Sequence, residues 1–312
     1  MHVMRWISAF ILLIVSVAQA QPGDNIMIGS GPRDGHYYAI GGAVCRVLNS
    51  DHPSSCSVAP TGGSVDNLYA LSLGDVNFAI VQADVHDTAR SGLAKIPGSY
   101  SELRTVASVY SEMLTVVIRA DSDIFRFSDL IGRKVAAGTF DSGSYWAFRS
   151  MLKSLDLTIA DFGSVAMQTD TASALALCNH DLDAFLMMTG HPSNVLSRIG
   201  DTCPVRVVAL SIDEVRAMLA HNPSYRPIAV PPGLYSFAPH PVPTVGVDTM
   251  LVTFEKTPDW QVEAILSSIF GDVEAFRQQQ YGLSPRPAST RDPFTSYHPA
   301  AIRYFSRRGM TQ

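Results

Sequence analysis

Apolar and polar positions along this chain repeat in the order of a strand, a glycine loop and a helix. The first such unit has an apolar run at residues 26–28, a glycine-rich loop at residues 29–35, and apolar residues at helical spacing from Tyr37 to Leu48. A loop of this kind directs backbone N–H groups and the positive end of a helix dipole at one point. That point suits a carboxylate or a phosphate. Because glycines also serve in any tight turn, the interpretation depends on how often the unit recurs.

The unit recurs three more times. Apolar runs predict strands at residues 57–59, 134–137 and 183–188, which lead into turns at residues 61–64, 138–144 and 189–193, and a helical pattern follows each turn. In the second turn we expect Ser64 to be the N-cap of its helix. In the fourth turn we expect Pro192 to take the first helical position, where its missing N–H costs nothing.

The rest of the chain continues the alternation of strands and helices. The run at residues 76–81 is nearly all apolar, as in a buried parallel strand. Further strands are predicted at residues 103–110, 114–119, 165–167, 205–210 and 245–254, and helices at residues 128–132, 145–155, 169–178, 212–220, 260–270, 272–280 and within 297–305. Residues 226–244 are rich in proline and are expected to be irregular.

This order of elements predicts a chain that crosses twice between two α/β lobes. The expected crossing strands are residues 114–119 and 245–254. The first lobe would comprise residues 21–116 plus 251–312, and the second lobe residues 117–250, with 226–250 as an interlobe segment. Ligands of open α/β sheets bind beyond the carboxyl ends of the strands, so the four glycine turns are expected to face a cleft between the lobes. Hinge closure around a ligand is a standard behaviour of this architecture.

The amino terminus has the pattern of a secretory signal peptide. Residues 1–20 combine Arg5 with an apolar run and end in Ala18-Gln19-Ala20, which places small residues at the −3 and −1 positions. We expect cleavage before Gln21 and a periplasmic location, with a retained membrane anchor as the alternative. No second run in the sequence has the length of a membrane helix.

Composition and motifs narrow the function classes. The chain has 23 basic and 28 acidic residues and no long basic run, so no nucleic-acid partner is expected. It has no G-x-S-x-G elbow, and the pair Gly29 and Gly31 fails the Rossmann fingerprint because the third glycine is Gly35. We therefore expect a monomeric binding protein rather than an enzyme, with no catalytic residues, no cofactor and no metal.

The four cysteines all lie past the predicted signal, in a compartment where disulfides persist. Their order suggests the bridges Cys45–Cys56 and Cys178–Cys203, one in each lobe, although four cysteines allow three connectivities. No CxxC pair or histidine cluster accompanies them, which argues against a zinc site.

Several short motifs occur together, in a fixed order, behind the predicted signal. They are Ile28-Gly29-Ser30-Gly31, Gly35-His36-Tyr37-Tyr38, Thr61-Gly62-Gly63-Ser64, Ala79-Ile80-Val81-Gln82-Ala83-Asp84, Gly190-His191-Pro192, Val242-Pro243-Thr244-Val245-Gly246 and His298-Pro299-Ala300. In this order they resemble the TAXI family of solute receptors, which serve TRAP transporters. The resemblance covers nearly the whole mature chain, and the paired cysteines resemble a subset of that family with one bridge per lobe.

The resemblance implies an α/β type II periplasmic-binding-protein fold, with two lobes joined by a two-strand hinge and a ligand cleft between them. It also implies capture of a small organic anion, such as glutamate, a dicarboxylate or a keto acid, for delivery to a TRAP permease in the membrane. Two segments depart from the family pattern, namely Pro32-Arg33-Asp34 and Phe140-Asp141. Both are expected to narrow the pocket or change its charge.

Twelve residues at the turns and in the interlobe segment are candidate ligand contacts. They are Ser30, Arg33, Tyr37, Gly63, Ser64, Gln82, Thr139, Ser142, Gly143, Ser144, His191 and Tyr235. Gln82 combines a donor and an acceptor in one group, which suits an amino acid or a keto acid. The alternatives are core packing for Tyr37, helix capping for Ser64 and His191, and a solvent-exposed position for Arg33.

Two other functions fit the same pattern. The fold also suits a periplasmic subunit that reports ligand state to a membrane kinase. An exported hydrolase using Ser142 or His191 is the remaining alternative.

Overall fold

The computed structural model describes residues 25–51, 55–92, 98–279, 284–287 and 296–310, so the predicted signal peptide lies outside the described residues. The strands are β1 (Ile26–Gly29), β2 (Cys56–Ala59), β3 (Phe78–Gln82), β4 (Leu103–Arg119), β5 (Lys134–Ala136), β6 (Ser164–Ala166), β7 (Ala184–Thr189), β8 (Val205–Val208), β9 (Arg226–Val230) and β10 (Val242–Phe254). The helices are α1 (His36–Asp51), α2 (Ser64–Leu73), α3 (Ala83–Ser91), α4 (Gly143–Ser154), α5 (Asp170–Cys178), α6 (Asn194–Thr202), α7 (Ile212–His221), α8 (Asp259–Phe270), α9 (Val273–Gln279) and α10 (Pro299–Arg307), with short 3-10 helices at Phe127–Leu130 and Ile159–Asp161.

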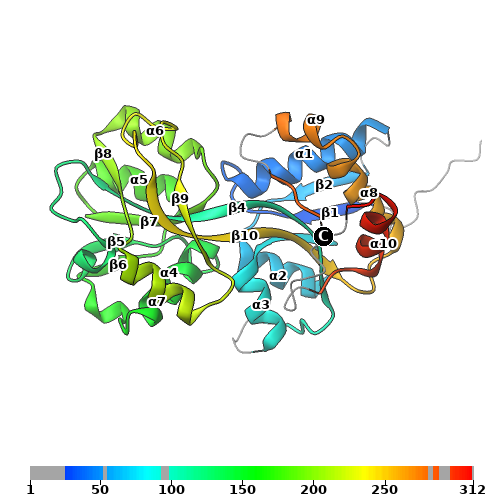
Figure 1. Cartoon of the computed structure of the whole chain (residues 1–312), viewed down its shortest axis with the longest axis horizontal. Helices are drawn as coiled ribbons and strands as arrows, with labels where there is room; N and C mark the ends of the chain where they lie inside the picture. Colours follow the sequence, from blue (N-terminus) through cyan, green and yellow to red (C-terminus); the bar gives the residue numbers. More distant parts are fainter. Residues whose placement is uncertain (1–24, 52–54, 93–97, 280–283, 288–295, 311–312) are drawn as a thin grey trace, which may run out of the picture.

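Two groups of parallel strands are joined by two long antiparallel strands. Strand β1 pairs in parallel with β2 and β3, and β5 pairs in parallel with β6 and β7. Strands β4 and β10 pair with each other and run from one group to the other (Figure 1). We call the part built on β1–β3 with α1–α3 and α8–α10 the first lobe, and the part built on β5–β9 with α4–α7 the second lobe.

Separate apolar clusters fill the two lobes. In the first lobe, Ile40 and Val44 lie one helical turn apart on α1 and pack in a cluster with Phe78 of β3. In the second lobe, Phe148 of α4 packs in a cluster with Leu186 of β7. Burying an aliphatic or aromatic side chain of this size contributes about 1.5–3 kcal/mol, so each lobe has a substantial core of its own.

Three predictions about elements were wrong. Residues 103–119 form one strand rather than two, because Ser111, Glu112 and Met113 continue the ladder with β10. Helix α3 was not predicted because its sequence is mostly polar, although it buries residues including Val85 and Ala89. Strand β9 lies in the segment expected to be irregular, and pairing with β10 stabilises it.

Two predictions about helix starts were also wrong. Gly63 is the N-cap of α2, with a φ of 122° that favours glycine, and Ser64 is the first helical residue. The Ser64 hydroxyl accepts instead from the Gln82 backbone N–H at 3.1 Å. Helix α6 begins at Asn194 with Ser193 as its N-cap, so Pro192 precedes the helix and His191 does not cap it.

The predicted disulfide pairing is confirmed. Cys45 is bonded to Cys56, and Cys178 to Cys203, with Cα–Cα distances of 5.0 and 5.7 Å. Each bridge lies within one lobe. Among the helices of the described residues, none has the length and apolar character to cross a membrane.

Candidate functional site

The second and third glycine turns, one from each lobe, touch each other. The Val65 N–H donates to the Asp141 carbonyl across the lobes at 3.2 Å. A Cβ atom added to Gly62 would lie 3.4 Å from the Asp141 Cβ, and one added to Gly63 would lie 3.3 Å from the Ser142 Cα. The glycines therefore let the N-termini of α2 and α4 come close together.

Five polar residues gather beside this contact, and we call them the central cluster: Tyr37, Ser64, Gln82, Tyr110 and Glu112. The Glu112 carboxylate accepts from the Tyr37 hydroxyl at 2.9 Å and from the Tyr110 hydroxyl at 3.1 Å. The Tyr37 and Ser64 hydroxyls are hydrogen-bonded to each other at 3.1 Å. All five side chains are buried, so this is a polar site built into the interior between the lobes.

Burial dominates the electrostatics of the central cluster. Loss of solvent raises the pKa of Glu112 to about 7, even though hydrogen bonds from Tyr37, Gln82 and Tyr110 favour its ionised form. Burial, followed by the nearby Glu112 charge, raises the pKa of Tyr37 and of Tyr110 well above the usual range, so both hydroxyls stay protonated. Glu112 is thus the group of the cluster that changes charge near neutral pH.

Gln82 reaches from the first lobe to the start of α4. A Cβ atom on Gly143 would lie 2.3 Å from the Gln82 Nε2, so the glutamine amide packs directly against the first residue of that helix. The Gln82 side chain is 1% exposed, and its Oε1 has no hydrogen-bond partner in the part of the chain that the structure describes. The Ser142 hydroxyl accepts from the Tyr145 N–H at 3.1 Å, whereas the amides of Gly143 and Ser144 have no acceptor within the helix by its geometry.

A second polar group adjoins the central cluster. The His191 ring bonds the Thr115 hydroxyl through Nε2 at 3.0 Å and the Tyr235 hydroxyl through Nδ1 at 2.9 Å. His36 stacks on the Tyr110 ring with centroids 5.7 Å apart. Burial, with the neighbouring His36, lowers the pKa of His191 to about 4, and burial lowers the pKa of His36. Both imidazoles are therefore neutral at physiological pH.

Further hydrogen bonds join the lobes outside the clusters. The Thr171 hydroxyl donates to Asp34 at 2.7 Å, and the Tyr225 hydroxyl donates to Asp84 at 2.6 Å. The buried Asp84 has its pKa raised to about 7 by loss of solvent. These bonds describe a closed arrangement of the two lobes.

The structure brings half of the predicted contact residues together. Tyr37, Gly63, Ser64, Gln82, Ser142 and Gly143 meet at the interlobe contact, and His191 and Tyr235 form the adjoining group. The other four are engaged in different ways. Arg33 is exposed and donates to the Tyr38 hydroxyl at 2.8 Å, and the Ser30 hydroxyl donates to the Ala59 carbonyl at 2.8 Å. The Ser144 hydroxyl accepts from the Met188 N–H at 2.9 Å, and the Thr139 carbonyl accepts from the Ser142 hydroxyl at 2.7 Å.

Sequence reasoning missed three members of the site: Glu112, Tyr110 and His36. Glu112 lies between the two predicted strands, and Tyr110 is the last residue of the first of them. An acidic residue between two strongly apolar runs was the signal available. Had the two runs been joined into one buried strand, Glu112 would have been a buried carboxylate needing an explanation.

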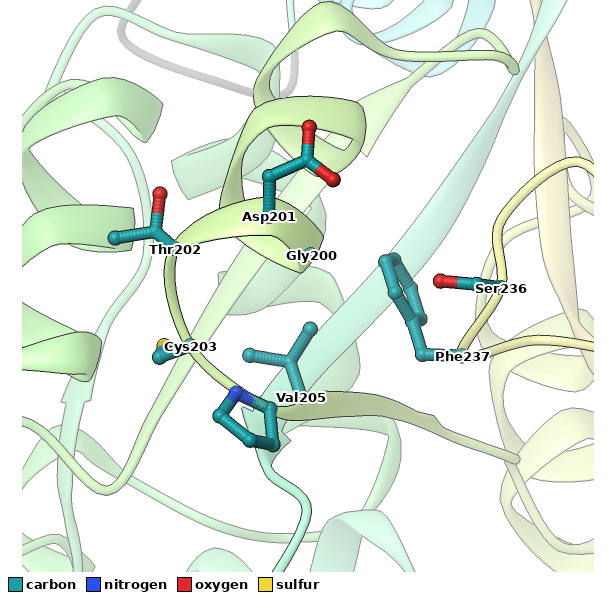
Figure 2. Close-up of a pocket in the computed structure, with 8 residues that line it drawn as sticks. Gly200, Asp201, Thr202, Cys203, Val205, Ser236 and Phe237 are labelled. Atoms are coloured by element: carbon teal, nitrogen blue, oxygen red, sulfur yellow. The ribbon is translucent and has the colours of Figure 1, made fainter.

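Two hollows lie outside the central cluster, and the larger one borders it at Val65 and Ala83. The smaller one, of about 440 Å³, is formed by the end of α6 and the segment around Phe237 (Figure 2). A groove of about 1790 Å³ runs between α3 and α4. It exceeds the usual volume of a small-molecule pocket, and its Asp248 is already paired with Arg226 at 2.7 Å and with Arg286. The central cluster is therefore the stronger candidate site.

Known structures share this architecture. A protein from Bordetella bronchiseptica RB50 is 14% identical with a TM-score of 0.59, over 92% of this chain and 98% of that one. The alkanesulfonate-binding protein SsuA from Xanthomonas axonopodis pv. citri, bound to MOPS, is 12% identical with a TM-score of 0.50, over 94% and 96%. A histidine kinase sensor domain with similarity to periplasmic binding proteins is 15% identical with a TM-score of 0.52, over 83% and 96%.

At these identities the likeness concerns the fold. The chain has the α/β fold of type II periplasmic binding proteins, with a mixed sheet continuous through two lobes. A model of the NMT1-like family matches residues 28–309, and the chain therefore belongs to the NMT1-like family.

Proposed function

We propose that the protein is an extracytoplasmic solute receptor that captures a small organic anion and delivers it to a TRAP-type permease in the membrane. The observation that carries the proposal is the meeting of two helix N-termini, from opposite lobes, around a buried polar cluster. Helix N-termini favour negative charge, and a site between two lobes encloses a small molecule when they close.

We propose that the hinge lies in the two long strands β4 and β10. Residues 21–116 plus 251–312 would move as one body and residues 117–250 as the other, with β4 and β10 bending between them. The predicted signal peptide and the two disulfides support a periplasmic location. The resemblance of the motifs to the TAXI family supports a TRAP permease as the partner.

The ligand contacts are assigned by position. The amides of Gly143 and Ser144 at the start of α4 would bind the ligand's anionic group, and Tyr37, Ser64 and Gln82 would contact it from the first lobe. We propose that His191 and Tyr235 line a further side of the ligand site. Arg33, Ser30, the Ser144 side chain and the Thr139 backbone carbonyl support the loops instead.

A binding screen tests the receptor function. The purified protein is unfolded, dialysed and refolded to remove any bound solute, and its melting temperature is measured against amino acids, 2-oxo acids, dicarboxylates and sulfonates. One class should raise the melting temperature, because a ligand at 100 times its Kd stabilises by about 2.7 kcal/mol. If refolded protein of native circular dichroism responds to none of them, the proposal is wrong.

A sensing role is the second candidate, favoured by the fold shared with the histidine kinase sensor domain. The two roles differ in the membrane partner. Reconstitution with a TRAP permease should give ligand uptake if the protein is a receptor for transport, and reconstitution with a membrane histidine kinase should give ligand-dependent phosphorylation if it is a sensor. Turnover of a bound compound, abolished by Ser142→Ala or His191→Ala, would instead indicate an enzyme.

A further inference from the structure

The central cluster contains a feature that a purely anionic ligand does not explain. Glu112 is 4% exposed and is linked through the Tyr37 hydroxyl to Ser64, the first residue of α2. Its partners in the described residues are neutral: Tyr37 and Tyr110 donate to it, and hydrogen bonds from Gln82 and Thr249 also lower its pKa. A carboxylate at this place repels a second carboxylate, and it attracts a cation that enters the site.

The groups around the cluster leave that negative charge unbalanced. His36 packs against Tyr110, but burial lowers its pKa, so it is neutral. Asp84 is the nearby charged group of α3 and has the same sign as Glu112. A buried carboxylate without a cationic partner is costly, which makes it a candidate for binding rather than for stability.

The Gln82 carboxamide indicates what belongs between Glu112 and α4. A hydrogen bond from Gln82 lowers the pKa of Glu112, and a Cβ atom on Gly143 at the start of α4 would lie 2.3 Å from Nε2 and 2.7 Å from Oε1 of the same carboxamide. Oε1 has no hydrogen-bond partner among the described residues. The carboxamide thus joins Glu112 to the start of α4 and leaves an acceptor close to the amides of that helix. A ligand with an ammonium group and a carboxylate on adjacent atoms has the same arrangement, with a full charge at each end.

We infer that Glu112 is the specificity-determining residue of the cleft and that the ligand is an α-amino acid, whose ammonium group binds Glu112 while its carboxylate binds the amides of Gly143 and Ser144. The inference rests on the proposed receptor function and narrows its ligand class. On opening of the lobes, the Gln82 carboxamide moves away from α4 and the amino acid takes its place. A 2-oxo acid of the same skeleton carries a carbonyl oxygen where the ammonium would be, and that oxygen faces Glu112 without a proton to share.

Matched ligand pairs test this directly. Refolded, ligand-free protein is titrated calorimetrically with L-glutamate and 2-oxoglutarate, L-alanine and pyruvate, and L-leucine and 4-methyl-2-oxopentanoate. For whichever skeleton binds, the amino acid should bind at least about tenfold more tightly than the 2-oxo acid, as expected when a buried polar group is left unpaired. Tighter binding of a 2-oxo acid would overturn the inference while leaving the receptor function intact. Binding of none of the six, with a sulfonate or dicarboxylate bound instead, would do the same.

The variant Glu112→Gln separates this role from a structural one. It keeps an acceptor for Tyr37 and Tyr110 but lacks the charge, so the preference for the amino acid should shrink at least about tenfold. Glu263→Gln on α8, which removes a surface partner of Arg307, is the matched control and should keep the wild-type preference. An unchanged preference in Glu112→Gln would overturn the inference, provided that its melting temperature shows a folded protein.

Proton exchange gives a second readout. Because Glu112 titrates near pH 7, an ammonium group beside it should expel a proton on binding, whereas an anion should draw one in. Calorimetry at pH 6.5 in buffers of different ionisation enthalpy measures the sign. Proton uptake on binding of the amino acid, or the same release in Glu112→Gln, would contradict the assigned contact.

Discussion

Two carboxylates on the paired hinge strands have opposite surroundings. Asp248 on β10 lies opposite Ser111 on β4, and Glu112 is the next residue along β4. Successive side chains of a strand point to opposite faces, so the two carboxylates lie on opposite sides of the hinge. Asp248 is partly exposed and pairs with Arg226 and Arg286, whereas Glu112 is buried among neutral hydroxyls.

The difference separates a structural acid from a functional one. Asp248 has its counter-charges within the chain, so its pairing fastens β9, β10 and the carboxyl-terminal segment together. Glu112 has no counter-charge among its described partners, so the free energy that burial of its charge costs is not offset within the protein. Groups held at such cost occur most often at binding and catalytic sites.

The largest expected effect is a loss of ligand affinity when a side chain fills the space at Gly143 that the Gln82 amide occupies. Gly143→Val places a Cβ where the Gln82 amide lies, so the lobes cannot close fully. Ligand affinity should fall at least about a hundredfold, or about 2.7 kcal/mol. Calorimetry with the ligand found in the screen measures this. Gly42→Ala, whose new Cβ makes only ordinary contact with Arg46, is the control, and equal affinities for the two variants would refute closure at this point.

The next effect concerns stability without ligand. The folded state holds the Glu112 proton more tightly than the unfolded state, so this residue's contribution to stability falls as the pH rises from about 4.5 to about 7. Glu112→Gln should therefore raise the free energy of unfolding at pH 8 by about 1–3 kcal/mol. Urea unfolding at pH 5.5 and pH 8 measures it. In the variant, the free energy of unfolding should depend less steeply on pH than in the wild type. Some dependence should persist, because Asp84 also has a raised pKa. A variant less stable than wild type at pH 8 would mean that Glu112 is structural.

Removing the other acid should act in the opposite direction. Asp248→Asn leaves Arg226 and Arg286 without their counter-charge, and the free energy of unfolding should fall by about 1 kcal/mol at low salt. Ligand preference should not change, since Asp248 lies on the other side of the hinge. Unfolding curves and calorimetry on one preparation check both points. An altered preference would show that the two faces are coupled.

The smallest expected effect concerns the bond between the first loop and α5. Thr171→Val removes the hydroxyl that donates to Asp34 in the closed form. The loss of one partly exposed hydrogen bond should weaken ligand affinity about two- to fivefold, or about 0.5–1 kcal/mol. Thr202→Val at the end of α6, where the hydroxyl bonds its own helix, is the control. No difference between these variants would mean that the first loop does not contribute to closure.

The sequence predicted the scaffold well because glycine turns and apolar runs are local signals. The sequence predicts that the turns at Gly63 and Gly143 and the side chains of Tyr37 and Gln82 face the cleft, and these residues meet at the interlobe contact. Both disulfides were also paired correctly, since each joins neighbouring elements of one lobe.

The parts that could not be predicted depend on contacts distant in sequence. Glu112 interrupts an apolar pattern, and its strand is continuous only because β10 pairs along its whole length. Ser64 resembles a helix cap by sequence, yet its hydroxyl bonds Gln82 and Tyr37, which lie on other elements. Helix α3 has a mostly polar sequence, and one of its polar residues, Asp84, is buried because it bonds Tyr225 of the second lobe. Pattern reasoning has no access to such partners.

The close approach of Gly62 to Asp141 has a practical consequence. A Cβ on Gly62 would lie 3.4 Å from that of Asp141, which is near the roughly 3.5–4.5 Å separation of a disulfide. Each native disulfide joins residues of a single lobe, so the double variant Gly62→Cys, Asp141→Cys would add a reducible disulfide between the lobes. If this variant is oxidised in the presence of its solute, the new disulfide should hold the lobes closed. The protein would then retain the solute through purification until a reductant cleaves the bond.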